Sequence, residues 1–199
     1  MVEKRDVRSF FDRLAPGWDA ETVRNEPVIA RILDTAGVRE GCTVLDVACG
    51  TGVLFGDYVR RGAAQVTAID LSPEMAARAA AKTGGSPVTV LCGDVETDVR
   101  VQENAPYDVV MVYNALPHFP DPARLVRTLA GLVKAGGHLS IAHGMSRAAL
   151  DAHHSGCARD VSVGLLHEDE LKSLMAAYLD VDTVISDEEM YQVCGKKRA

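Results

Sequence analysis

The chain lacks the cysteine pattern of a disulfide-stabilised or zinc-binding protein. Its 199 residues include five cysteines, an odd number, and no CxxC pair. Aromatic residues make up only 5% of the sequence, and no apolar run approaches the ~18 residues of a membrane span. The N-terminal segment MVEKRDVRSFFDRL mixes charges of both signs and has no apolar run of signal-peptide length. These absences predict a cytoplasmic protein with reduced thiols and no membrane insertion.

The chain also lacks an excess of basic charge. Lysine and arginine number 21 against 28 aspartate and glutamate residues, so the formal net charge is −7. Nucleic-acid affinity rests largely on clustered cationic side chains, and the basic run Lys196-Lys197-Arg198 is short. We therefore expect no nucleic-acid partner.

What is present is an average globular composition, with 47% apolar and 25% charged residues. Short β-branched runs alternate with longer helical segments. The expected strands span 43–47, 65–70, 88–92, 107–113 and 138–142, and the expected helices between them span 53–61, 72–82 and 121–133. Near-continuous apolar strands that alternate with helices predict a mostly parallel sheet with helices on both faces, a Rossmann-like three-layer α/β sandwich.

The last forty residues change character. A helix is expected over 168–179, and two strands at 181–186 and 190–194 are separated only by the acidic turn 187–189. Strands so close in sequence pair as an antiparallel hairpin. The sheet is therefore expected to end in a C-terminal antiparallel hairpin.

A turn of small residues, Ala48 to Gly52, joins the first strand to its helix. Small residues let the backbone turn tightly and approach a ligand, and the following helix offers its N-terminal NH groups. Asp70 ends the second strand, 24 residues after Asp46, where a carboxylate can accept both ribose hydroxyls of a nucleoside. Asp94 follows the third strand, where a carboxylate can accept from an adenine amino group. Their joint placement favours a nucleoside site over the alternative of a packing turn with capping carboxylates.

Four segments resemble the successive motifs of the class I S-adenosylmethionine-dependent methyltransferases: DVACGTG at 46–52, AIDLSP at 68–73, GDVE at 93–96 and YDVVMVYNALPHF at 107–119. They are most similar to the small-molecule branch that includes the ubiquinone/menaquinone-biosynthesis type. The resemblance implies a seven-stranded sheet, S-adenosylmethionine as cofactor with S-adenosylhomocysteine as its product, and a small-molecule methyl acceptor. Ala48 replaces the first glycine of the family's usual DxGxGxG, which the turn tolerates unless the backbone there needs a positive φ.

The resemblance also implies the cofactor-binding residues, which lie at or after the ends of four strands: Asp46, Ala48, Cys49, Gly50, Gly52, Asp70, Leu71, Asp94, Val95, Tyr113 and Asn114. The glycine-rich turn would enclose the methionine part. Asp70 would accept the ribose hydroxyls with Leu71 against the adenine, and Asp94 and Val95 would meet the adenine edge. Tyr113 and Asn114, at the end of the fourth strand, would line the space near the sulfonium.

The resemblance also suggests an organisation for one domain, residues 1–199. Residues 1–40 would form an N-terminal helical cap, 41–145 the cofactor-binding core, 146–170 a substrate lid and 171–199 a helix with the terminal hairpin. Phe10, Phe11 and Trp18 are expected either to close the acceptor site or to pack against the sheet. A monomer and a homodimer are both compatible with the sequence.

Four histidines are candidates for a catalytic base or an orienting group. Histidine changes charge near neutral pH and suits acid–base work. His118 follows the fourth strand and His143 follows the fifth, so both are expected at the rim of the cofactor site. His153 and His154 lie on an expected helix over 147–154 and rank second. A loop histidine that bonds only to backbone or water is the alternative for each.

Other chemistries remain open but are less favoured. His143, His153 and His154 match no standard metal-ligand spacing, so no metal is expected. A thiol site at Cys49 and Cys157, as in arsenic methylation, would need more clustered cysteines. A nicotinamide-dependent oxidoreductase would normally have GxGxxG, and Gly56 comes one residue late for that spacing. A non-catalytic S-adenosylmethionine-binding module is a further alternative, and the acceptor atom (O, N, C or S) is not indicated.

Overall fold

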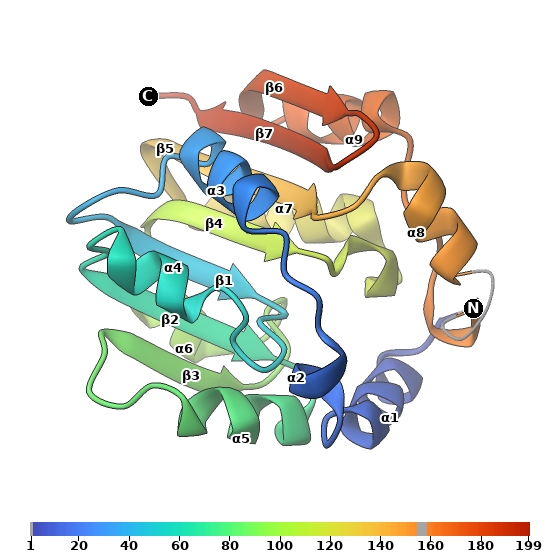
Figure 1. Ribbon diagram of the computed structural model, residues 1–199. Helices are drawn as coiled ribbons and strands as arrows, with labels where there is room; N and C mark the ends of the chain where they lie inside the picture. Colours follow the sequence, from blue (N-terminus) through green and yellow to red (C-terminus); the bar gives the residue numbers. More distant parts are fainter. Residues whose placement is uncertain (1, 155–158) are drawn as a thin grey trace.

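The computed structural model describes residues 2–154 and 159–199, which form a seven-stranded sheet between two layers of helices (Figure 1). The strand order is β3-β2-β1-β4-β5-β7-β6. The strands are β1 (Thr43–Val47), β2 (Gln65–Asp70), β3 (Val88–Cys92), β4 (Tyr107–Tyr113), β5 (Val133–His143), β6 (Leu179–Ser186) and β7 (Tyr191–Lys197). β1 to β5 run parallel, and β7 lies antiparallel between β5 and β6. This confirms the expected fold class and its terminal hairpin.

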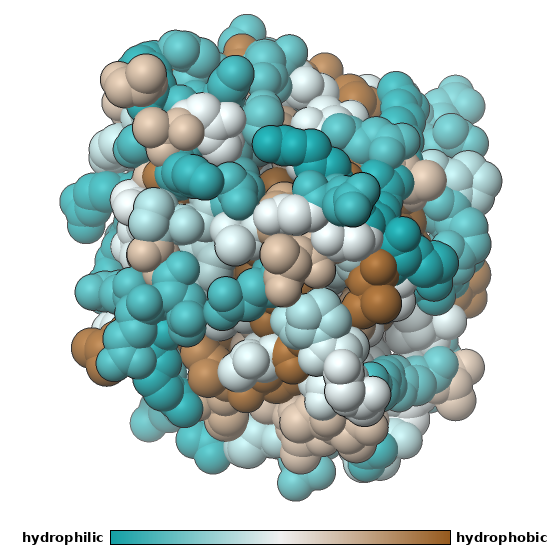
Figure 2. Space-filling model, turned by 90° about the vertical axis from the view of Figure 1, so that its left-hand side faces the viewer, coloured by the Kyte–Doolittle hydropathy of each residue, from teal (hydrophilic) through white to brown (hydrophobic). Residues whose placement is uncertain are grey.

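Helices cover both faces of the sheet and the edge where the parallel strands end (Figure 1). One face carries α3 (Glu26–Thr35), α4 (Phe55–Arg60) and α5 (Pro73–Ala81), and the other carries α6 (Val99–Glu103), α7 (Pro122–Leu132) and α9 (Glu168–Ala176). Beyond the carboxyl ends lie α1 (Lys4–Leu14), α2 (Trp18–Glu21), α8 (Arg147–His154), and the 3₁₀ turns η1 (Leu116–His118) and η2 (Arg159–Val161). The surface where the strands begin is largely hydrophilic (Figure 2). Within the described ranges, no helix is long and apolar enough to cross a bilayer.

Successive residues of β1 point into two different cores, as the period of two in a strand requires. Leu45 and Val47 pack in the cluster that includes α7, whereas Val44 packs with residues of α3 and α4. Asp46 shares the face of Val44 and is 2% exposed. An ionisable residue is therefore placed on the inner side of a strand, beneath helix α4.

The expected helix starts after β2 and β4 are confirmed. The Ser72 hydroxyl accepts from Met75 N at 3.1 Å, and the Asp121 carboxylate accepts from Arg124 N at 2.9 Å. In each case proline follows the cap at a position where its missing N–H costs nothing. These caps start α5 and α7 close to the carboxyl ends of the strands.

Several boundaries differ from the sequence expectation. Helix α9 ends at Ala176 rather than 179, β6 begins at Leu179 rather than 181, and β7 extends to Lys197 rather than 194. β5 begins at Val133 rather than 138, because a register shift opposite Tyr107 to Val109 takes up the extra residues. Glycine is needed there, since a Cβ on Gly137 would lie 2.6 Å from the Asp108 carbonyl. Helix α4 begins at Phe55 rather than 53, because the preceding residues continue the tight turn.

Candidate cofactor and acceptor site

A cavity of about 590 Å³ lies at the carboxyl ends of β1, β2 and β4, and α1 and α2 cover it. This volume falls within the roughly 300–1,000 Å³ of typical small-molecule sites. Nine of the eleven residues expected to bind the cofactor contribute to its wall, together with one of the four candidate histidines. They are Ala48, Cys49, Gly50, Asp70, Leu71, Asp94, Val95, Tyr113 and Asn114, with His118.

Two of the expected cofactor residues, Asp46 and Gly52, are not among the wall residues of the cavity. Burial and the nearby Asp70 charge raise the pKa of Asp46 to about 8. Gly52 has φ +83°, and a Cβ there would lie 2.5 Å from the Phe55 ring. The structure therefore places Asp46 beneath the turn and gives Gly52 a packing reason to be glycine.

The glycine-rich turn has a positive φ at three of its positions. Ala48 has φ 54°, Gly50 has φ 57° and Gly52 has φ 83°. Alanine in this region is disfavoured by roughly 1–2 kcal/mol relative to its usual conformations, so the turn holds strain at the position where glycine was expected. Cys49 lies between Ala48 and Gly50, and its N–H donates to the Ile69 carbonyl at 3.1 Å. Burial raises the pKa of the Cys49 thiol well above its usual range, so the thiol stays protonated.

Asp70 connects the end of β2 to this turn. Its Oδ2 accepts the Gly50 N–H at 2.8 Å, and its Oδ1 accepts the Ser72 N–H at 2.9 Å. Burial raises the pKa of Asp70 to about 6, although the two backbone N–H groups act in the opposite direction. Each carboxylate oxygen has two lone pairs, so both can still accept a ligand hydroxyl. The geometry suits a ribose diol at the cavity wall.

Asp94 is engaged by a residue from the start of the chain. Lys4 Nζ lies 2.6 Å from Asp94 Oδ2 and also pairs with Glu96. Burial acts to lower the pKa of Lys4, but its hydrogen bonds and charge interactions with the two carboxylates raise it overall. No pattern in the sequence indicated this pair, because 90 residues separate its members. These ion pairs therefore hold helix α1 against the residues that follow β3, where the adenine was expected.

Tyr113 and Asn114 form the wall at the end of β4. Asn114 has φ 55°, and its Oδ1 accepts the Gly144 N–H at 2.9 Å. A Cβ on Gly144 would collide with the Tyr113 hydroxyl. Glycine at 144 therefore leaves the space that the tyrosine side chain occupies.

His118 is the candidate histidine that lines the cavity. Its Nδ1 lies 2.8 Å from the Val161 carbonyl oxygen. A carbonyl only accepts, so Nδ1 carries the proton, and the lone pair of the neutral ring is on Nε2. The ring also packs edge-on against Phe11, with centroids 4.9 Å apart.

The other candidate histidines are placed differently. His143 ends β5 but is fully buried and packs against Tyr191, its partner across the strand pair with β7. It is not among the wall residues of the cavity, so the structure does not bring it together with His118. His153 and His154 end α8, and their side chains lie outside the described residues, as does Cys157. Among described residues, no group of three or more metal-ligating side chains is present.

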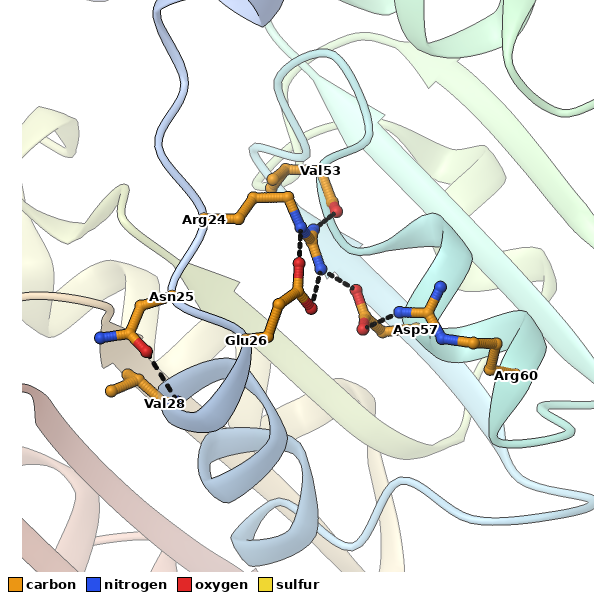
Figure 3. A network of polar contacts seen from close by, with 7 residues as sticks. All are labelled: Arg24, Asn25, Glu26, Val28, Val53, Asp57 and Arg60. Carbon is orange, nitrogen blue, oxygen red and sulfur yellow. Dashed lines mark hydrogen bonds and ion pairs between the residues drawn. The ribbon is translucent and has the colours of Figure 1, made fainter.

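Arg24 is a wall residue that sequence reasoning missed (Figure 3). Its Nε lies 2.7 Å from Glu26 Oε1, its Nη2 lies 2.8 Å from Asp57 Oδ2, and its Nη1 donates to the Val53 carbonyl. The two carboxylates raise the pKa of Arg24, mainly through the hydrogen bond with Glu26. The linker between α2 and α3 is thereby tied to the residues that follow the glycine-rich turn.

Comparison with known proteins identifies the family of domains that this site resembles. Residues 45–141 match the family model described as a methyltransferase domain. By this match, residues 45–141 form a methyltransferase domain. The match confirms the resemblance drawn from the motifs.

Curated relatives of the methyltransferase domain include two ubiquinone biosynthesis O-methyltransferases. The protein from Serratia proteamaculans (strain 568) is 43% identical over 146 residues, which cover 69% of this chain and 60% of the relative. The protein from Vibrio cholerae serotype O1 (strain M66-2) is 34% identical over 146 residues, covering 69% and 59%. The chain thus spans about three fifths of the length of these relatives.

Solved structures share the fold of the methyltransferase domain at low sequence identity. A methyltransferase in complex with the Haloferax volcanii Trm112 activator superposes with a TM-score of 0.77, at 20% identity, over 97% of this chain and 98% of that one. Magnesium protoporphyrin IX methyltransferase from Synechocystis PCC 6803, with bound S-adenosylhomocysteine, gives 0.72 at 16% identity, over 99% and 100%.

Proposed function

We propose that the protein transfers a methyl group from S-adenosylmethionine to a small-molecule acceptor. The observation that carries the proposal is one cavity in which Asp70 and the glycine-rich turn share a wall with His118. The cofactor supplies an activated methyl group on a cationic sulfonium, and the protein supplies alignment. Asp70 accepts the ribose hydroxyls, and the backbone from 48 to 51 encloses the methionine part. Asp94, with Leu71 and Val95, meets the adenine.

The acceptor is an apolar ring compound that bears a hydroxyl group. The remaining wall is rich in apolar side chains, namely Phe10, Phe11, Leu14, Trp18, Phe119, Met145 and Leu150. Phe11 contacts both Trp18, at 5.6 Å between centroids, and His118. Aromatic rings prefer such edge-to-face and offset neighbours. The names of the curated relatives, O-methyltransferases of ubiquinone biosynthesis, support an oxygen acceptor.

His118 serves as the base for that hydroxyl. Its Nδ1–H donates to the Val161 carbonyl, which sets the ring orientation and puts the lone pair of the neutral ring on Nε2, the atom that accepts the hydroxyl proton. A hydroxyl is a weak nucleophile until it loses its proton, so the base contributes in step with methyl transfer. His143, His153 and His154 have no assigned part in this step.

The described parts of the segment 146–170, residues 146–154 and 159–170, act as the acceptor lid, and residues 155–158 lie outside the described residues. Leu150 of α8 lines the cavity, and Val163 N donates to the Pro117 carbonyl at 2.8 Å. Together with the bond between Val161 and His118, this contact ties the lid to the rim loop after β4. The single-domain organisation, the cytoplasmic location and a homodimer stay predictions from the sequence.

A labelled-methyl assay tests the proposal. Purified protein, S-adenosylmethionine with a labelled methyl group and a panel of phenols and catechols should yield labelled product and S-adenosylhomocysteine. In thermal unfolding, S-adenosylhomocysteine should raise the Tm and NADH should not. Stabilisation by NADH alone would contradict the proposal. Binding of S-adenosylhomocysteine without turnover of any acceptor would favour a non-catalytic binding module.

A further inference from the structure

Trp18, the only tryptophan of the chain, faces the glycine-rich turn from α2. Its indole Nε1 lies 3.9 Å from the point that a Cβ on Gly50 would occupy, and both residues line the cavity. The next residue, Asp19, accepts from the Thr51 hydroxyl and pairs with Lys82 Nζ at 2.7 Å. These bonds fix the position of α2 relative to the turn, so the indole lies over Gly50.

The indole N–H of Trp18 has no acceptor among the described residues. The ring packs edge-on against Phe11, and the hydrogen bond of Trp18 with a side chain is made by its carbonyl, which accepts the Thr22 hydroxyl at 2.7 Å. The indole nitrogen only donates, and its hydrogen bond with a charged acceptor is stronger than one with a neutral acceptor. A ligand in the cavity would supply that acceptor.

The order of the strands decides which part of the cofactor reaches this donor. Asp94 follows β3, Asp70 ends β2, and the turn with Gly50 follows β1, and these strands are neighbours in the sheet. If the first two carboxylates take the adenine and the ribose, as proposed above, the methionine part extends over the turn. That part carries the one carboxylate of the cofactor.

Arg24 lines the same region, but its guanidinium already binds carboxylates of the protein. Its guanidinium lies between Glu26 and Asp57, as Figure 3 shows. We propose that the Trp18 indole N–H binds the carboxylate of the methionine part of S-adenosylmethionine. This inference rests on the proposed placement of the cofactor, with its nucleoside on Asp70 and Asp94.

Calorimetric binding of two ligands to the Trp18→Phe variant tests the proposal. Phenylalanine keeps an aromatic ring beside Phe11 and removes the N–H. The affinity for S-adenosylhomocysteine should fall roughly tenfold, the usual effect of losing a hydrogen bond to a charged group. The affinity for methylthioadenosine, which lacks the carboxylate, should be unchanged. In the wild-type protein, S-adenosylhomocysteine should change the Trp18 fluorescence more than methylthioadenosine does.

The controls separate this contact from general packing. Phe11→Leu removes the ring partner of Trp18 and should weaken both ligands by a similar factor. Equal losses for both ligands in Trp18→Phe, or no loss for either, would overturn the proposal while leaving the cofactor site intact. If the wild-type protein bound neither ligand, the proposed function would fail as well. Equal thermal stability of Trp18→Phe and wild type shows that the variant is folded.

Discussion

The Asp70 carboxylate accepts the backbone N–H of Gly50 at 2.8 Å, so the residue that ends β2 holds the turn that follows β1. The two residues belong to adjacent parallel strands whose carboxyl ends meet at one edge of the sheet. This edge is where open α/β sheets bind ligands. A single carboxylate therefore both shapes the turn and faces the cavity.

Cofactor affinity and folding stability should depend on pH in opposite directions through Asp70. Burial raises its pKa from 3.8 to about 6, so the folded state holds the proton more tightly than the unfolded chain. This group therefore makes the free energy of unfolding fall as the pH rises from 3.8 to about 6. Cofactor affinity should rise over the same range, because the ionised carboxylate is the better acceptor for the ribose hydroxyls. Calorimetric titration with S-adenosylhomocysteine at several pH values measures this affinity.

Substitution of the same residue gives the control. Asp70→Asn should weaken S-adenosylhomocysteine binding roughly ten- to hundredfold. It should also flatten the pH dependence of that affinity between about pH 5 and 7, the range in which a group with a pKa of about 6 titrates. Asp180→Asn, an exposed carboxylate on β6, should leave affinity unchanged. An Asp70→Asn variant with wild-type affinity would remove this residue from the ribose role.

Removal of the Lys4 charge should loosen α1 from the cavity. Lys4→Met leaves Asp94 and Glu96 without their common cation, at an expected cost of about 1 kcal/mol after allowance for solvent screening. Hydrogen exchange in residues 4–14 should become faster. Arg5→Met is the matched control, because the Arg5 pair with Asp6 is highly exposed. Equal exchange in the two variants would mean that Lys4 does not fasten the helix.

Gly52→Ala should destabilise the protein by about 2–4 kcal/mol, because the new Cβ meets the Phe55 ring and the positive φ disfavours alanine. Gly131→Ala is the control on α7, where a Cβ has open space. Alanine is the better helix former there, so that change should stabilise by roughly 0.5–1 kcal/mol. Urea unfolding measures both, and a tolerated Gly52→Ala would contradict the packing reason.

His118→Gln should lower turnover by about a hundredfold or more while leaving S-adenosylhomocysteine affinity unchanged, as expected for loss of a general base. Wild-type activity should decline on the acid side as the imidazole takes up a proton, and the variant should lack that limb. His138→Gln, at the amino end of the sheet, provides the comparison. Full activity of the His118 variant would leave only a structural role for this residue.

The carboxylates on β1 and β2 show what a sequence motif predicts about a site and what it does not. Both Asp46 and Asp70 were expected at the cofactor, since the strand ends and the spacing between them can be read from the chain. Asp70 does line the cavity, but Asp46 lies on the strand face that packs under α4. Whether a residue at the end of a buried strand borders the cavity depends on what packs against that face of the strand, which a motif does not specify.

Local patterns determined much of this protein by themselves: the parallel sheet, the capped helices after β2 and β4, the antiparallel hairpin and the residues of the glycine-rich turn. Each depends on hydrogen bonds, propensities or alternation among residues close in sequence. Only the tertiary structure decided that Lys4 pairs with Asp94, that Trp18 lies over Gly50 and that His143 is buried away from His118. Those relationships join side chains from separate elements, and packing of the whole chain brings them together.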